Sequence, residues 1–187
     1  GWLLGDWRWG EEGNNLRLGW DLQANRWCGR IAAQPWSEAL PEICPSGTRL
    51  GPLAATAAAA LGLPSGCPVV AGSTDASAAV LAADPQPGDG ITVLGTTLVL
   101  KQFSPQPISG PGISCQRLAG QWLVGGASNA GAGVLRRFFS DGQLAELSRQ
   151  LDPRRPSGQN LRPLPRPGER FPVDDPLSLI HISEPTR

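Results

Sequence analysis

The sequence predicts an α/β chain, because runs typical of strands alternate with runs typical of helices. The runs CPVVAG (67–72) and ITVLGTTLVLKQF (91–103) are rich in apolar and β-branched residues, as strands are. The runs PLAATAAAAL (52–61) and ASAAVLAA (76–83) are rich in alanine, which has the highest helix propensity. Alternation of the two kinds of run along one chain is typical of the α/β class.

The first predicted helix covers residues 52–61. Pro52 suits the first turn of a helix, and Gly62 suits the position that ends it. A turn follows, and we expect residues 67–72 to form a short, buried strand.

A second helix, made of small residues, is expected after Asp75. The stretch ADPQPGDG (83–90) is then a loop, because it is rich in Pro, Gly and Asp. Residues 91–103 are expected to form two β segments around Gly95.

Residues 112–127 have the pattern of a β-hairpin with its turn at Ala119-Gly120. A helix over residues 130–139 is expected next. Its apolar residues fall on one face: Val134, Leu135, Phe138 and Phe139.

Ser140 and Gln143 have the spacing of a capping box, which predicts the start of another helix. The apolar face of that helix consists of Leu144, Leu147 and Leu151. Residues 152–176 contain many prolines, and we expect an extended loop or linker there.

Composition narrows the classes of function. The chain has 187 residues, enough for about one domain or parts of two. Its 16 basic and 16 acidic residues balance, so no nucleic-acid partner is expected. No apolar run approaches the roughly 20 residues that span a bilayer, so no membrane partner is expected. The four cysteines lack C-x-x-C spacing, so we expect no metal site and free thiols in a reducing compartment such as the cytoplasm.

Both ends of the chain suggest a fragment. The sequence starts at Gly1, and the next residues, WLLG (2–5), already look like part of a secondary-structure element. Residues 177–187, LSLIHISEPTR, resemble a translated sequencing adaptor, and we exclude them from the fold. They contain the only histidine, His181, so histidine-dependent hydrolysis and histidine metal sites are not expected.

Two features near the N-terminus have a functional and a structural interpretation. Six of the seven tryptophans lie within residues 1–36. Indole faces can stack on sugar rings, but packing at a domain surface is the favoured interpretation. Glu11 and Glu12 could form a pair of acids, although a solvated turn before Gly13 is favoured.

Asp75 is the strongest candidate for chemistry. A carboxylate between the small residues of a strand-end turn has room for a substrate hydroxyl beside it. It could accept the proton of that hydroxyl as the oxygen attacks a phosphoryl group. The structural alternative is that Ser73, Thr74 or Asp75 caps the following helix, and this is favoured on local sequence alone.

Gly95, Thr96 and Thr97 form a second candidate site. A glycine after a strand lets a phosphate approach the backbone, where N–H groups and threonine hydroxyls bind its oxygens. The segment GGASNAGAG (125–133), which includes Gly131, precedes a predicted helix and also suits an anion or nucleotide. Its structural alternative is tight packing through small residues, and it lacks the G-x-G-x-x-G spacing of a dinucleotide fold.

Each of these segments alone is a weak signal of function, but their order along the chain is a strong one. PVVAGSTDASAA, GDGITVLGTTLVLK, WLVGGASNAGAGVLRRF and GERFPVDDP closely resemble the FGGY carbohydrate kinases. NNLRLGWD, LPEICPSGTRLGPL and AAALGLPSGCPVVAG fit the same family, and the resemblance covers nearly all of residues 1–176. Within the family the chain looks most like the D-ribulose kinase and xylulose-kinase-like members of cyanobacteria and plants.

This resemblance implies an actin-like ATPase fold, in which two RNase H-like domains flank a cleft. Residues 1–83 would be the end of the first domain, and residues 84–176 the start of the second. The implied partners are small molecules, a sugar and ATP, with Mg²⁺ as cofactor. The implied compartment is the cytoplasm, or the plastid stroma if the source is a plant.

The resemblance also implies roles for individual residues. Asp75 takes the position of the catalytic base, which binds the sugar and deprotonates the hydroxyl that attacks the γ-phosphate. Gly95, Thr96 and Thr97 match the turn that faces the ATP phosphates. Gly131 matches a glycine near the nucleotide.

Members of the family also carry an N-terminal D-x-G-T phosphate turn and a C-terminal glycine-rich loop around adenosine. This sequence holds neither, so we expect the 187-residue chain by itself to lack kinase activity. The main alternative is a non-catalytic nucleotide- or sugar-binding actin-like module, a pseudokinase, against which the presence of Asp75 argues. A Rossmann-type oxidoreductase is a poorer match, because no G-x-G-x-x-G follows a strand.

Overall fold

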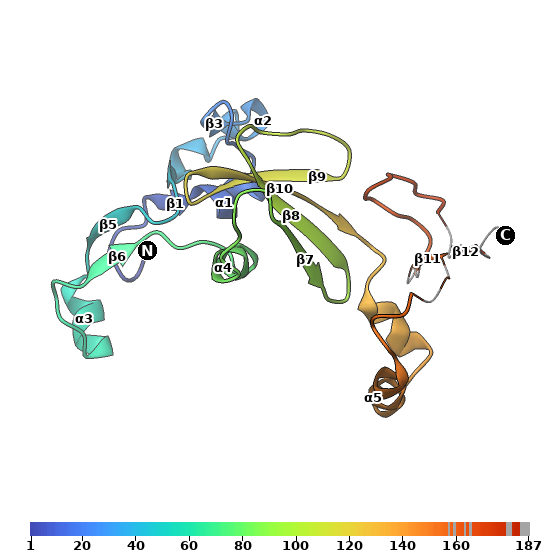
Figure 1. The fold of residues 1–187 in the computed structure, drawn as a ribbon. Helices are drawn as coiled ribbons and strands as arrows, with labels where there is room; N and C mark the ends of the chain where they lie inside the picture. Colours follow the sequence, from blue (N-terminus) through green and yellow to red (C-terminus); the bar gives the residue numbers. More distant parts are fainter. Residues whose placement is uncertain (157, 159, 163, 165, 179–180, 184–187) are drawn as a thin grey trace. The chain divides into compact units, whose positions relative to one another are not determined.

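The computed structural model in Figure 1 describes residues 1–156, 158, 160–162, 164, 166–178 and 181–183. These residues form two compact units. The first unit consists of residues 1–87, 103–107 and 116–123, and the second of residues 88–102, 108–115 and those from 124 onward. The predicted domain boundary between residues 83 and 84 stays a prediction.

The first unit contains short elements. In chain order they are β1 (Trp9–Glu11), α1 (Glu12–Asn15), η1 (Leu16–Leu18), β2 (Trp20–Asp21), β3 (Arg26–Trp27), α2 (Gly29–Ala32), η2 (Ser37–Ala39), β4 (Glu42–Cys44), β5 (Arg49–Pro52), α3 (Ala55–Leu61), β6 (Pro68–Val70) and α4 (Asp75–Ala82). Strands β1 and β4 pair in parallel, whereas β2 with β3 and β5 with β6 pair antiparallel.

Helix α3 confirms the helix predicted from the alanine run, with one correction at its start. Pro52 is the last residue of β5 rather than part of the helix. The pairing of β5 with β6 extends one step further, because the Leu53 N–H donates to the Cys67 carbonyl at 2.9 Å. The helix therefore begins only at Ala55, and it ends at Gly62, whose φ of 64° lies in the left-handed region.

The strand expected at residues 67–72 forms as β6, but it is not buried. Val70 keeps 49% of its surface exposed, because among the described residues β6 pairs with β5 alone, in a two-stranded sheet. A small core lies on one side of this sheet, where Leu53, Ala57 and Ala58 pack with Val69.

The tryptophans divide between packing and exposure. Trp20 and Trp27 pair across the β2–β3 hairpin, with ring centroids 5.4 Å apart in an edge-to-face arrangement. Trp2, Trp7 and Trp36 are exposed. The packing interpretation therefore fits Trp20 and Trp27 best.

A four-stranded sheet, most of whose residues belong to the second unit, has the order β7-β8-β10-β9 (Figure 1). Its strands are β7 (Gly90–Leu94), β8 (Leu98–Ser104), β9 (Ile113–Leu118) and β10 (Gln121–Ser128). The hairpin predicted at residues 112–127 is confirmed as β9 and β10, and the two β segments expected around Gly95 form the antiparallel pair β7 and β8. Ala119 and Gly120 both have positive φ, 50° and 76°, as a tight turn between twisted strands requires.

The helix expected over residues 130–139 is shorter and of a different type. Gly131 is extended, so the element begins at Ala132 and is the 3₁₀-helix η3 (Ala132–Arg137). Val134 is buried, but Phe138 keeps 65% of its surface exposed, so the predicted single apolar face is wrong. A 3₁₀-helix places residues on different faces from an α-helix, since it has three residues per turn.

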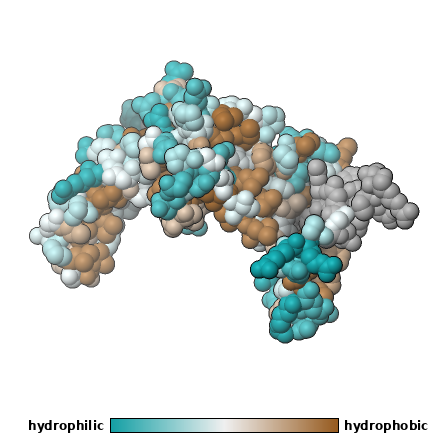
Figure 2. Space-filling model, in the orientation of Figure 1, coloured by the Kyte–Doolittle hydropathy of each residue, from teal (hydrophilic) through white to brown (hydrophobic). Residues whose placement is uncertain are grey.

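Helix α5 (Asp141–Gln150) begins with the predicted capping box between Ser140 and Gln143. Its apolar side chains are not buried in the described part of the chain: Leu147 is 41% exposed and Leu151 73%. Figure 2 shows hydrophobic residues gathered on the surface over β7 and β8 as well, where Val93 and Leu94 are exposed.

The described residues of the proline-rich stretch are mainly loop, as expected, but they also include one short strand and an isolated bridge. Strand β11 (Asn160–Arg162) pairs antiparallel with β12 (His181–Ser183), and Glu169 forms an isolated bridge with Asp175. Strand β12 lies in the segment predicted to be foreign, and that origin stays a prediction. Residues 179–180 and 184–187 of the segment lie outside the described residues.

Among the described residues, no helix is long and apolar enough to cross a bilayer. In the same part of the chain, no three His, Cys, Asp or Glu side chains gather as a metal site would require. The four cysteines are free thiols.

Candidate functional site

The turn between β7 and β8 brings four predicted site residues together. It consists of Gly95, Thr96 and Thr97, and the Gly95 N–H donates to the Thr97 carbonyl at 3.0 Å. The Ala132 N–H donates to the Gly95 carbonyl at 2.9 Å, which places Gly131 directly beside the turn. Residues more than thirty positions apart therefore form one local structure in the second unit.

Glycine is required at position 131 because of this contact. A methyl group on Gly131 would overlap the Thr96 carbonyl oxygen and the Thr97 backbone. Gly95 and Thr96 are exposed, and Thr97 is half-buried, so a ligand can reach the turn. Backbone N–H groups and threonine hydroxyls are the donors that bind phosphate oxygens, so the arrangement suits an anionic group.

A buried carboxylate holds the segment that leads into Gly131. Glu169 is only 7% exposed and accepts hydrogen bonds from the Ser128 hydroxyl at 2.5 Å and the Asn129 N–H at 2.8 Å. Burial raises the pKa of Glu169, but these hydrogen bonds and those from the Arg170 and Phe171 N–H groups outweigh it, so the pKa is lowered. Glu169 had no predicted role, although it lies within the motif GERFPVDDP.

Asp75 is the first residue of α4, in the first unit. The helix cap is Thr74, whose Oγ1 accepts from the Ser77 N–H at 3.2 Å. Thr74, and not Asp75, is therefore the residue that caps the helix. The Asp75 carboxylate is exposed, and its Oδ1 accepts from the Ala76 N–H at 2.7 Å.

The expectation of a solvated turn at Glu11 and Glu12 is wrong. Both are buried, at 9% and 6% exposure. Glu11 caps α1: its carboxylate accepts from the Gly13 and Asn14 N–H groups, both at 2.8 Å. It also accepts from the Ser46 hydroxyl at 2.6 Å, a contact 35 residues away that no local pattern reveals.

Burial also raises the pKa of Glu12; Arg117 opposes the rise and Glu11 adds to it. The folded state thus binds a proton more tightly than the unfolded state. Protonated Glu12 therefore stabilises the folded state below its ordinary pKa. This stabilisation is lost as the pH rises through the pKa of Glu12 in the folded state. We expect Glu12→Gln, which mimics the neutral acid, to raise the thermal midpoint at about pH 7 and to have little effect at about pH 4.

The matched control is Glu38→Gln, which removes an exposed carboxylate from the same unit. Thermal unfolding of both variants at the two pH values makes the measurement. A Glu12→Gln variant that is equally stabilised or destabilised at both pH values would contradict the buried, proton-binding state of Glu12.

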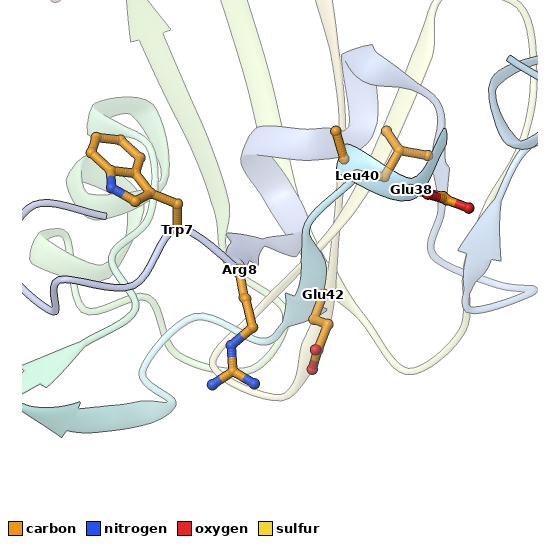
Figure 3. Close-up of a pocket in the computed structure, with 6 residues that line it drawn as sticks. Trp7, Arg8, Glu38, Leu40 and Glu42 are labelled. Atoms are coloured by element: carbon orange, nitrogen blue, oxygen red, sulfur yellow. The ribbon is translucent and has the colours of Figure 1, made fainter. Parts of the chain in front are cut away.

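A pocket of about 480 Å³ lies elsewhere in the first unit. Its lining comes from η2, β4 and the residues before β1: Trp7, Arg8, Glu38, Ala39, Leu40 and Glu42 (Figure 3). Arg8 is bound by Asp6 at 2.8 Å. None of the predicted site residues lines this pocket.

Comparison with known proteins identifies the fold. No model of a known protein family matches the chain. The chain is similar to the structure of a xylulose kinase from Rhodospirillum rubrum, with TM-score 0.71 and 26% identity, over 86% of this chain and 36% of that one. A ligand-bound xylulose kinase from Lactobacillus acidophilus matches with TM-score 0.73 and 18% identity, over 98% of this chain and 40% of the kinase.

A gluconate kinase from Lactobacillus acidophilus matches with TM-score 0.74 and 19% identity, over 99% of this chain and 40% of the kinase. The chain thus spans well under half the length of these structures. It has the fold of part of an actin-like ATPase, as found in these sugar kinases.

Proposed function

We propose that the full-length protein containing this chain is an FGGY-type kinase that transfers the γ-phosphoryl group of ATP to a hydroxyl of a sugar. The observation that supports this most directly is the packing of Gly131 against the exposed Gly95–Thr97 turn. That packing brings two distant segments together and fixes the turn that carries the Thr96 and Thr97 hydroxyls. The similarity to sugar kinase structures supplies the reaction class.

In this proposal the two predicted groups of residues have separate tasks. The Gly95–Thr97 turn binds phosphate oxygens through the donors of Thr96 and Thr97, since the Gly95 N–H is bonded within the turn. Gly131 allows its segment to pack directly against that turn, beside the nucleotide. Asp75 accepts the proton of the attacking sugar hydroxyl, whose oxygen forms the new bond to phosphorus as ADP leaves. Mg²⁺ would neutralise charge on the ATP phosphates, to which it binds more readily than to all-protein cages.

The proposed substrate is a ketopentose, with D-ribulose as the first choice from the sequence resemblance. The test is ADP release by the full-length protein with ATP, Mg²⁺ and one sugar at a time: D-ribulose, D-xylulose, gluconate or glycerol. We expect turnover that depends on a ketopentose. Turnover with gluconate alone would refute the substrate class, and binding of ATP without turnover of any sugar would favour the non-catalytic module.

A further inference from the structure

Glu169 uses both oxygens of its carboxylate to bind the backbone and side chains of other residues. Oε2 accepts from the Ser128 hydroxyl at 2.5 Å. Oε1 accepts from the N–H groups of Asn129 and Arg170, both at 2.8 Å. An ionised carboxylate at 7% exposure is costly unless it is hydrogen-bonded, and here several donors satisfy it.

The two residues beside Glu169 bind the same segment. The Gly168 carbonyl accepts from the Asn129 side-chain amide at 3.0 Å. The Arg170 Nε donates to the Ala127 carbonyl at 2.7 Å. Residues 168–170 therefore fix residues 127–129 through contacts that span about forty positions of sequence.

Ser128 links the Glu169 carboxylate to the residues just before Gly131. Its hydroxyl accepts from the Ala130 N–H at 3.0 Å while it donates to Glu169. The next two residues are Gly131, which packs on Thr96, and Ala132, which donates to the Gly95 carbonyl. Two sets of hydrogen bonds, joined by the backbone of residues 130–132, thus connect the carboxylate to the exposed turn.

We propose that Glu169 is a positioning residue, which holds residues 128–131 so that Gly131 and the Gly95–Thr97 turn form the ATP phosphate site. This inference rests on the proposed kinase function and adds a residue that acts without touching substrate. The carboxylate is occupied by Ser128, Asn129 and Arg170, so it acts through their positions and not as an acid or base.

The test compares Glu169→Ala and Glu169→Gln in the full-length protein. The alanine variant leaves the Ser128 and Asn129 donors unmatched, and we expect its KM for ATP to rise by about 10- to 100-fold, as for a misplaced binding group. The KM for the sugar should stay near the wild-type value. The glutamine variant should restore most of the ATP affinity, because its amide oxygen accepts from the backbone N–H groups and its NH₂ donates to Ser128.

The control for a loss of stability alone is Ser140→Ala. It removes the capping box of α5 in the same unit and should cost about 0.5–2 kcal/mol of stability. Its KM for ATP should stay at the wild-type value. Equal KM values for ATP in Glu169→Ala and Ser140→Ala would overturn the positioning role.

Amide hydrogen exchange separates this inference from the proposed function. With Glu169→Ala, exchange at residues 129–132 and 95–97 should accelerate, because the hydrogen bonds to the carboxylate are lost, while α5 keeps its wild-type rate. Unchanged exchange at those residues would overturn the positioning role whatever the enzyme assay shows. A wild-type protein without sugar kinase activity would overturn the proposed function and leave the exchange result to decide on Glu169.

The pH dependence gives a further readout. The lowered pKa of Glu169 means that it stabilises the fold above its ordinary pKa and that this stability is lost as the pH falls through the folded value. The difference in thermal midpoint between wild type and Glu169→Gln should therefore narrow from about pH 7 to about pH 4. A constant difference would show that the carboxylate is not held ionised by these donors.

Discussion

Replacing Asp75 with asparagine in the full-length protein is expected to lower kcat by about 10²- to 10⁴-fold, the usual contribution of a positioned general base. Asparagine has nearly the same shape, and its amide oxygen can keep the hydrogen bond from the Ala76 N–H, which is 2.7 Å long with aspartate. It cannot take the proton of the attacking hydroxyl. Because Thr74 caps α4, the substitution leaves the helix cap intact.

The matched control for Asp75→Asn is Asp141→Asn. Both aspartates are the first residue of a helix that follows a hydroxyl cap, Thr74 in one case and Ser140 in the other. Each substitution removes a negative charge from the first turn, where it stabilises the helix by about 0.3–1 kcal/mol. Asp141 also has an exposed ion pair with Arg136, a kind of contact that contributes little.

Steady-state kinetics should therefore show a large loss of kcat for Asp75→Asn, wild-type kcat for Asp141→Asn, and a KM for ATP that stays near normal in both. Equal turnover in the two variants would remove Asp75 from the base position. A raised KM for ATP in Asp75→Asn with unchanged kcat would instead assign the residue to nucleotide binding.

Features encoded in a few adjacent residues were predicted correctly. The Ala119-Gly120 turn and the Ser140–Gln143 capping box each depend on residues within four positions of one another, so local patterns are enough. The same holds for the end of α3 at Gly62. The helix at residues 130–139 was misjudged, because contact of Gly131 with Thr96 keeps the backbone extended there, and propensity does not report that contact.

The candidate site was only partly predictable for the same reason. The order of the motifs indicated Gly95, Thr96, Thr97 and Gly131, but the sequence alone gave no sign that Ala132 bonds to Gly95. Glu169 was missed because its partners lie about forty residues earlier in the chain. Glu11 and Glu12 were assigned to solvent because charged residues beside a glycine usually lie in turns. In the structure Glu11 is buried and accepts hydrogen bonds from Ser46 and the α1 backbone.

Replacing Gly131 with alanine should have the second large effect, on ATP binding and on stability together. The added methyl would overlap the Thr96 carbonyl oxygen, so either the turn or the segment 128–131 must move. Forced shifts of packed backbone cost about 1–3 kcal/mol, and we expect a lower thermal midpoint. The displaced donors should raise the KM for ATP by up to about 100-fold, whereas the KM for the sugar should change little.

Gly142→Ala is the matched control, because it adds the same methyl group to the same unit. A Cβ at Gly142 meets nothing within 4 Å, and the residue lies within α5. Alanine is a better helix former than glycine by about 0.8–1.0 kcal/mol, so this variant should be as stable as wild type or more stable. Its KM for ATP should be unchanged. If both alanine variants keep the wild-type KM for ATP, close contact between Gly131 and the Gly95–Thr97 turn is not needed for nucleotide binding. If Gly131→Ala loses ATP affinity while Gly142→Ala and the destabilised Ser140→Ala keep it, the exposed turn and the glycine segment act as one phosphate site, because neither the added methyl group nor a loss of stability alone accounts for the difference.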